Sequence, residues 1–178
     1  MGRQSDVLAT YRLQLRGPDS GASFTFEDAE GSLNYRAALG VSHLYLSPIL
    51  TAAAGSSHGY DVTDPTTVSA GLGGPDGLAR LSAAARARGL GIVVDIVPNH
   101  LGVELAQHNP WWWDVLRLGR ESAYYSFFDI DWDLDPDGRI VLPVLGSDDD
   151  IDHLVVDGEV FRLGDKEFPL APDTATGT

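Results

Sequence analysis

The residue that most strongly suggests chemistry is Asp95, because it interrupts an otherwise apolar, largely β-branched run at residues 90–97. Such a run predicts a strand buried on both faces, and an unpaired buried charge is costly. Asp95 is therefore either a structural carboxylate paired with an arginine or a site residue at the carboxyl end of a parallel strand, where α/β folds bind ligands. Asn99 and His100 follow directly and favour the second explanation.

A second polar group, His58-Gly59-Tyr60-Asp61, follows a different predicted strand. A tyrosine ring can stack on the apolar face of a sugar while neighbouring polar groups bind its hydroxyls. The alternatives are a surface histidine and a tyrosine that covers the core. Because the two groups are one βα unit apart, we predict a sugar site with these candidate binding residues: His58, Tyr60, Asp61, Asn99 and His100.

The elements that must position these groups alternate between strands and helices. Alternating or β-branched patterns predict strands at residues 9–15, 41–46 and 90–97. Thr25 and Asp28 form a capping-box signature for a helix that Gly40 ends, and Gly74-Pro75 begins another helix that Gly89 ends. Residues 52–57 between them are expected to form a loop. This order, β-α-β-loop-α-β, indicates parallel βαβ units.

The pattern changes beyond His100. Asn109-Pro110 begins a short helix that carries three tryptophans, which either cap a core or interface or contact sugar. Residues 140–145 resemble a strand, and 154–163 predict a hairpin centred on Asp157-Gly158. Residues 169–178 are expected to be a frayed tail.

Charge and composition narrow the partners. The formal net charge is −14, with a sequence pI near 4.4, so nucleic acid and anionic membranes are poor partners, whereas a neutral sugar is unaffected. Without cysteine the chain has no disulfide framework or thiol nucleophile. No signal-peptide pattern and no membrane-length apolar run occurs, so a cytoplasmic protein is expected.

Two acidic segments imitate cation sites. Asp133, Asp135 and Asp137-Gly138 match the opening of an EF-hand loop, but Val144 occupies the position of its final Glu. We interpret this segment as a polar turn and residues 148–152 as a solvated loop. No dinucleotide or phosphate-binding motif is present, and we predict neither a cofactor nor a metal ion.

Residues 58–61 and 95–100, together with Pro48, resemble the start of the catalytic barrel of the α-amylase superfamily, glycoside hydrolase family 13. The segments 10–15, 42–48 and 127–132 resemble the maltooligosyltrehalose synthase branch of that superfamily. The similarity runs from about Ala9 to about Pro172, nearly the whole chain.

The resemblance implies an α/β fold, the N-terminal part of a (β/α)8 TIM barrel. Residues 1–104 would supply about three βα units and 105–178 the start of the inserted subdomain, with a disordered tail. Because a complete barrel takes about 250 residues, we expect an N-terminal fragment. The nucleophilic Asp and acid/base Glu are expected beyond residue 178, so this chain is expected to be inactive alone and to self-associate through an exposed barrel edge.

The resemblance also implies roles for individual residues. Tyr60 would stack on the glucose at the bond to be broken, with His58 and His100 bonded to that sugar. Asp95 would organise the site through an arginine later in the barrel, and Asn99 matches a position that helps hold calcium in many amylases.

The implied activity is that of an intramolecular transferase, an isomerase, that converts the reducing-end α-1,4 linkage of a maltooligosaccharide to α,α-1,1 in trehalose biosynthesis. The alternatives are another enzyme of the superfamily, either a hydrolase or a 4-α-glucanotransferase, and a non-catalytic sugar-binding fragment.

Overall fold

A computed structural model describes residues 6–172 and residue 174 of the 178-residue chain. The chain divides into two compact units, Met1–Gly102 and Val103–Thr178, and each is described by itself.

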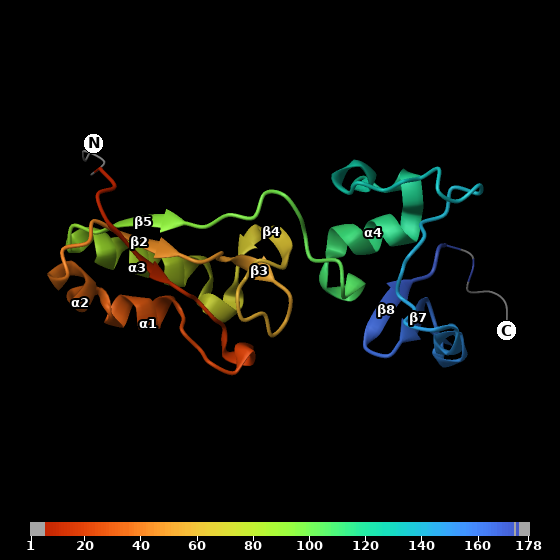
Figure 1. Cartoon of the computed structure of the whole chain (residues 1–178), viewed down its shortest axis with the longest axis horizontal. Helices are drawn as coiled ribbons and strands as arrows, with labels where there is room; N and C mark the ends of the chain where they lie inside the picture. The colour runs from red at the N-terminus through yellow and green to blue at the C-terminus, as the bar shows by residue number, and fades with distance from the viewer. Residues whose placement is uncertain (1–5, 173, 175–178) are drawn as a thin grey trace. The chain divides into compact units, whose positions relative to one another are not determined.

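The first unit is built on a three-stranded parallel sheet (Figure 1). Strands β1 (Thr10–Leu13), β2 (His43–Leu46) and β5 (Gly91–Val94) lie in the order β1-β2-β5, which confirms the parallel βαβ prediction. The third strand is shorter than predicted, because it ends at Val94. Its residues are only half-buried, since β5 pairs with β2 alone in the described part of the chain. Placing Asp95 inside a buried strand was therefore wrong: it follows the strand.

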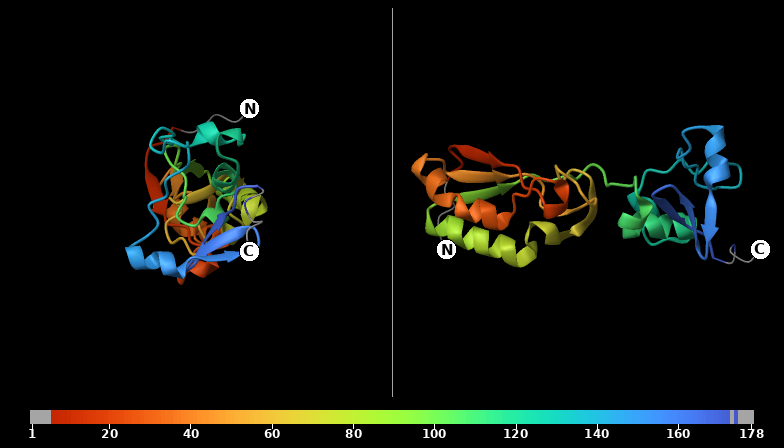
Figure 2. Two further views of the ribbon diagram at one scale, coloured as in Figure 1. Left: turned by 90° about the vertical axis from the view of Figure 1, so that its right-hand side faces the viewer. Right: turned by 90° about the horizontal axis from the view of Figure 1, so that it is seen from below.

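Helices α1 (Phe26–Gly31), α2 (Leu33–Ala38) and α3 (Gly74–Ala87) pack on one face of this sheet (Figures 1 and 2). The predicted capping box is present, with the Thr25 amide donating to Asp28 Oδ2 at 2.7 Å. The single helix predicted after it is two helices. They meet at Ser32, whose hydroxyl donates to the Ala29 carbonyl at 2.7 Å and so competes with the helical ladder.

The core of the first unit lies between the helices and the sheet. Alternate strand residues such as Leu13, Leu44 and Leu46 are buried there against Phe26 of α1 and Leu81 of α3. Because strand side chains alternate between faces, the residues between these leucines project from the opposite face. Arg12 and Tyr45, paired in the β1–β2 register, are therefore on the face away from the helices.

The segment expected to be a loop is flanked by a small antiparallel pair. Strand β3 (Leu50–Ala52) pairs with β4 (Val62–Val68), and residues 53–61 connect them. Short 3₁₀ turns at η1 (Pro18–Ser20) and η2 (Ala70–Leu72) complete the unit. The β3–β4 pair was not predicted, because β3 is three residues long and Pro65 interrupts the pattern of β4.

The second unit combines the predicted short helix with an antiparallel sheet. Helix α4 (Pro110–Leu118) is capped by Asn109, whose side-chain oxygen accepts from two backbone amides at 3.1 and 3.0 Å. Strands β6 (Val155–Asp157) and β7 (Val160–Leu163) form the predicted hairpin, and β8 (Lys166–Pro169) adds an unpredicted third strand. The 3₁₀ turn η3 (Ala106–His108) precedes α4, and η4 (Gly119–Glu121), η5 (Tyr125–Phe127) and η6 (Asp148–His153) lie between α4 and β6 in the chain.

Two further expectations for the second unit were wrong. Residues 140–145 form no strand, because they pack against the core without a partner strand. The predicted tail begins too early, since Pro169 belongs to β8; residues 173 and 175–178 of that tail lie outside the described part.

The tryptophan run and the acidic turn are explained by packing and local hydrogen bonds. Trp112 is buried in the core of the second unit, and Trp111 stacks on Tyr124. In the turn that imitates an EF-hand, Asp135 instead pairs with Arg139, at 3.1 Å. Within the described residues, no helix has the length and apolar character needed to cross a bilayer.

Candidate functional site

The candidate site is a hydrogen-bonded cluster at the carboxyl ends of the parallel strands. The Tyr60 hydroxyl donates to Asp95 Oδ2 at 2.5 Å. Arg12, from β1, donates to the Tyr60 hydroxyl at 3.1 Å and to the same Asp95 oxygen at 3.4 Å. We call Arg12, Tyr60 and Asp95 the polar triad. The structure thus joins the two polar groups that the sequence singled out.

The backbone of Asp95 is fixed by the sheet, although the residue lies just beyond β5. Its amide donates to the Leu46 carbonyl at 2.9 Å, which continues the β2–β5 ladder by one hydrogen bond. The side chain is 18% exposed, so it opens to solvent at the end of the strands. The local chain path therefore aims the carboxylate at the site.

Hydrogen bonds favour the ionised form of Asp95. The Tyr60 hydroxyl lowers the pKa of Asp95 below its ordinary value of 3.8, and hydrogen bonds from Tyr45 and Arg12 add to this effect against partial burial. An ionised, hydrogen-bonded carboxylate accepts hydrogen bonds but has no proton to donate. Asp95 is therefore suited to organising a site rather than to acting as a general acid.

The loop that carries Tyr60 is held from within. Gly59 has φ +77°, and a Cβ at this position would lie 2.9 Å from the Pro48 carbonyl oxygen, so a side chain is excluded. Ser56 Oγ accepts from the Gly59 amide at 3.0 Å and donates to Asp61 Oδ1 at 2.5 Å. Asp61 thus braces the loop in this structure.

His58 lies beside Tyr60 at the exposed side of the loop. The two rings are stacked, with centroids 6.0 Å apart and planes inclined by 27°. The Tyr60 amide donates to His58 Nδ1 at 3.0 Å, which orients the imidazole. The pair presents adjoining aromatic and polar groups, the combination that sugar sites use.

The structure does not bring all the predicted residues into contact. Asn99 and His100 are exposed, and neither side chain makes a hydrogen bond with another described residue. They follow Asp95 closely in the chain, so the predicted site contains one hydrogen-bonded part and one solvent-exposed part. Both explanations offered for Asp95 describe part of the structure: it is paired with an arginine, Arg12, and it lies at the carboxyl end of a parallel strand. The arginine that the resemblance implied, later in the barrel, is a different residue.

Sequence reasoning missed Arg12, Gln14 and Tyr45. Gln14 Oε1 accepts from Arg12 at 3.4 Å, and the Arg12 guanidinium lies over the Tyr45 ring, 4.9 Å from its centroid. The alternation of apolar and polar side chains along the first strand could have revealed Arg12 and Gln14. Its apolar residues point to the core, so Arg12 and Gln14 had to project from the face that carries the site.

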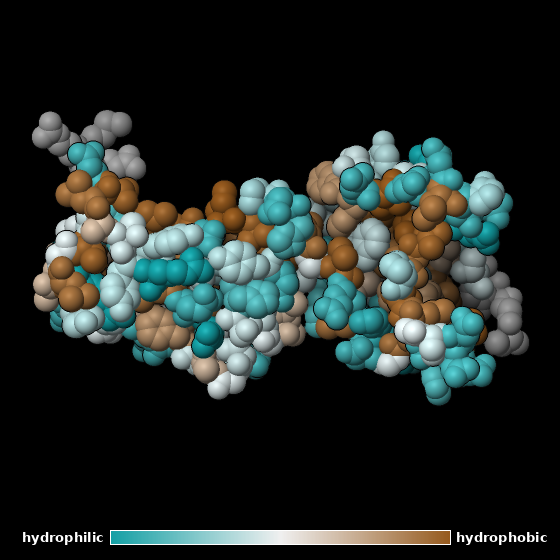
Figure 3. Space-filling view, viewed as in Figure 1, coloured by the Kyte–Doolittle hydropathy of each residue, from teal (hydrophilic) through white to brown (hydrophobic). Residues whose placement is uncertain are grey.

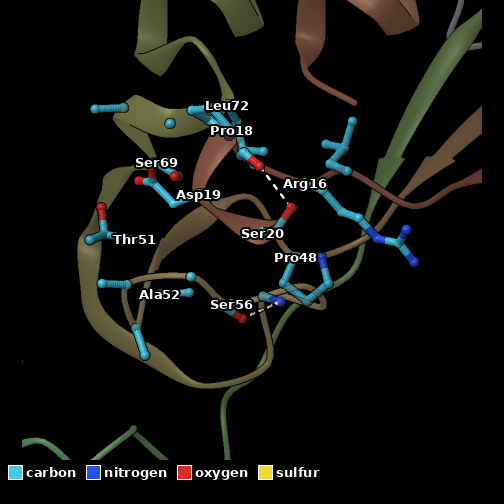
Figure 4. Close-up of a pocket in the computed structure, with 18 of the residues that line it drawn as sticks. Arg16, Pro18, Asp19, Ser20, Pro48, Thr51, Ala52, Ser56, Ser69 and Leu72 are labelled. Carbon is cyan, nitrogen blue, oxygen red and sulfur yellow. Dashed lines mark hydrogen bonds between the residues drawn. The ribbon is translucent and has the colours of Figure 1, made fainter. Parts of the chain in front are cut away.

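A cavity of about 260 Å³ lies behind the same loop (Figure 4). Its walls come from residues 15–20, 48–59 and 69–72 and are mostly small side chains and backbone. The lining hydroxyls of Ser20 and Ser56 are already hydrogen-bonded to the Gly17 carbonyl and to Asp61. The Asp19 carboxylate also lines the cavity and makes no hydrogen bond with another described residue. The polar triad remains the better candidate site, because it brings three polar groups together from separate segments of the chain.

In the part of the chain that the structure describes, no three His, Cys, Asp or Glu side chains come together in a group that could hold a metal ion.

Comparison with known proteins gives a consistent result. Residues 29–135 match the family described as alpha amylase, catalytic domain. A Mycobacterium tuberculosis (strain H37Rv) protein, provisionally named a maltooligosyl trehalose synthase, is 65% identical over 172 residues, 97% of this chain and 22% of the relative. The intracellular maltogenic amylase of Bacillus subtilis is 36% identical over 133 residues, 72% of this chain and 21% of the amylase.

Among solved structures, the maltooligosyltrehalose synthase from Arthrobacter ramosus matches with a TM-score of 0.88 and 50% identity. The match covers 96% of this chain and 22% of the synthase. The chain therefore spans about a fifth of the length of these relatives. The match with the α-amylase catalytic domain and the synthase structures implies a fold of the TIM-barrel type.

Proposed function

This chain belongs to the α-amylase family, and from that premise we propose that it forms the N-terminal part of the catalytic barrel of a maltooligosyltrehalose synthase. Residues 1–104 would supply about three βα units of the barrel, and residues 105–178 the start of the subdomain inserted after the third strand. The 65% identity with the Mycobacterium tuberculosis relative and the TM-score of 0.88 against the Arthrobacter ramosus synthase support this proposal.

The proposed reaction is an isomerisation of a maltooligosaccharide. The bond from C1 of the penultimate glucose to O4 of the reducing-end glucose breaks, and C1 bonds instead to the anomeric oxygen of that released glucose. A retaining route passes through a covalent glycosyl intermediate, for which a nucleophilic carboxylate and an acid/base carboxylate are needed. No water is consumed, and the product carries an α,α-1,1 linkage. A neutral substrate fits a chain of net charge −14.

In this proposal the described site binds the glucose unit next to the bond that breaks. Tyr60 would stack on its apolar face, and His58 and His100 would bind its hydroxyls. Asp95 would organise the site, while Asn99 and Asp61 would line it. The observation that carries the proposal is the position of Tyr60: its loop meets the carboxyl end of β5, where Asp95 holds its hydroxyl at 2.5 Å.

The two catalytic carboxylates are assigned to the portion of the relatives that this chain does not span, since it covers 22% of each. The 178 residues alone would then bind a maltooligosaccharide weakly without converting it. Measurable turnover by the purified chain, lost in His100→Ala, would contradict this assignment.

A chimaera tests the activity. The 178 residues replace the aligned segment of the Arthrobacter ramosus synthase, and maltopentaose is the substrate. The expected result is a loss of reducing ends with little free glucose, and a strong reduction of the rate in Tyr60→Ala. A chimaera that folds, shown by a cooperative melt, but only hydrolyses maltopentaose would contradict the synthase assignment.

The second candidate is an α-glucan hydrolase or 4-α-glucanotransferase of the same family. The 36% identity with the maltogenic amylase supports it over 72% of this chain. The same product analysis separates the two: a hydrolase creates reducing ends, and a glucanotransferase redistributes chain lengths without removing them.

A further inference from the structure

Arg12 contacts more parts of the candidate site than any residue the sequence singled out. Its guanidinium lies over the ring of Tyr45 on β2 and donates to Tyr60 in the β3–β4 loop. It also donates to Asp95 beyond β5 and to Gln14 on its own strand segment. One side chain on β1 therefore joins groups from three other segments of the chain.

The Tyr60 hydroxyl is fully engaged by this arrangement. A phenol has one hydrogen to donate, and Tyr60 donates it to Asp95 at 2.5 Å. The same oxygen accepts from Arg12 at 3.1 Å. With its hydroxyl held from two sides, Tyr60 can serve a ligand mainly through its ring face. The two hydrogen bonds fix where the hydroxyl end of the ring lies, and so the direction of the ring axis.

The chemistry of these contacts requires arginine rather than lysine. The guanidinium carbon lies over the Tyr45 ring, while two separate nitrogens reach Tyr60 and Asp95, at 3.1 and 3.4 Å. A lysine ammonium is a compact charge that cannot stack and bridge two acceptors in one plane. The side chain is 40% exposed, so these contacts, rather than burial, hold it in place.

We propose that Arg12 is a positioning residue that acts through Tyr60 and Asp95 to set the direction of the Tyr60 ring that receives a glucose unit. The identity of the ligand rests on the proposed function. The positioning itself is a property of the free chain and can be measured without any sugar.

The first experiment therefore uses the 178-residue chain alone. NMR follows the ring resonances of Tyr60, assigned with Tyr60→Phe, and the pH titration of the Asp95 carboxyl carbon. Arg12→Gln is expected to move the Tyr60 ring signals and to raise the pKa of Asp95 towards its ordinary value. Arg12→Lys is expected to move the ring signals as well, while restoring part of the change at Asp95, because it keeps the charge.

The matched control is Arg86→Gln. Arg86 is exposed on α3, and its side chain makes no hydrogen bond or ion pair with another described residue. The substitution removes the same charge and should leave Tyr60 and Asp95 unchanged. If Arg12→Gln also leaves both at their wild-type values, the positioning role is overturned whatever the protein's function.

The second experiment measures kinetics in the Arthrobacter ramosus chimaera. Arg12→Gln should lower kcat/KM by about 10- to 100-fold, mainly through kcat, because a displaced binding group misaligns the reacting sugar. Arg12→Lys should lose less of kcat/KM than Arg12→Gln. The control Arg86→Gln should leave kcat/KM at the wild-type value. An unchanged kcat/KM in Arg12→Gln would overturn the proposal. Activity of a different kind in the chimaera would refute the proposed function, while the NMR result still decides the role of Arg12.

Discussion

Asp95→Asn offers the most informative perturbation of the polar triad. The substitution keeps the shape and an oxygen acceptor but removes the charge that Tyr60 and Arg12 share. A hydrogen bond to a charged group contributes about 1.5–3 kcal/mol, and a solvent-exposed ion pair about 0–1 kcal/mol. Because the amide oxygen of Asn still accepts from Tyr60 and Arg12 is 40% exposed, the net loss should be about 1–2 kcal/mol.

The sign of the pH dependence follows from the lowered pKa of Asp95. The pKa of Asp95 is below 3.8 in the folded state, so ionised Asp95 stabilises the fold at pH values above the ordinary pKa of 3.8. This stabilisation is lost as the pH falls through the lowered pKa, because the carboxyl becomes protonated. The difference between wild type and Asp95→Asn should therefore be constant near neutral pH and vanish in strong acid.

Hydrogen exchange at the β2 amides is the appropriate assay. All four tryptophans lie in the second unit, so tryptophan fluorescence does not report on the sheet that holds Asp95. A loss of 1–2 kcal/mol should reduce the protection of the β2 amides by about 5- to 30-fold. Asp19→Asn is the control, because Asp19 is exposed and its side chain makes no hydrogen bond with another described residue. Equal protection in both variants, or a difference that grows in acid, would refute the reasoning.

Three further predictions concern the loop, the core and the surface. Gly59→Ala should cost more stability than Gly21→Ala. Both glycines have φ near +78°, but an added Cβ would lie 2.9 Å from the Pro48 carbonyl oxygen at Gly59 and would meet nothing within 4 Å at Gly21; equal thermal shifts would contradict this. Leu44→Ala, at a fully buried position, should destabilise the first unit by about 2–5 kcal/mol in denaturant titrations, and a loss under 1 kcal/mol would contradict the described core. The second unit exposes apolar side chains (Figure 3), including Val155 and Val156. The chain should therefore bind a hydrophobic dye and self-associate in sedimentation experiments, and the double variant Val155→Ser/Val156→Ser should do both less. A monodisperse monomer without dye binding would contradict this.

Local signals in the sequence predicted the elements whose ends depend on nearby residues. The Thr25–Asp28 capping box, the Asn109 cap and the hairpin within residues 154–163 are all present, although the two-residue turn is Gly158-Glu159, one residue later than predicted. Each depends on hydrogen bonds or turn geometry within a few residues, so the sequence window contains the cause. The parallel order of β1, β2 and β5 also followed from the alternation of strands and helices.

The errors occurred where partners distant in the sequence decide the structure. The apolar run at residues 90–97 predicted a longer strand, yet β5 ends at Val94, where β2 ends beside it. Residues 140–145 have a strand-like pattern but no strand to pair with. Periodicity predicts which side chains are apolar, whereas pairing depends on what the rest of the chain places alongside.

The residues of the candidate site were likewise predicted only in part. Asp95 was recognised because it interrupts an apolar run, and Tyr60 because a tyrosine between histidine and aspartate is a combination suited to binding a sugar. Arg12 was missed because an arginine on one face of a short strand resembles any solvated charge. Only the folded sheet, which places β1 two strands from β5, shows that Arg12 reaches both residues.

The central claim is that the polar triad and the loop at residues 58–61 receive a glucose unit. An NMR titration of the isotope-labelled 178-residue chain with maltopentaose tests this claim most directly, because weak binding still shifts the resonances of contacting residues. We expect saturable shifts at Tyr60, His58 and His100, and their loss in Tyr60→Ala. Shifts confined to the second unit, or none up to the solubility limit of the sugar, would contradict it.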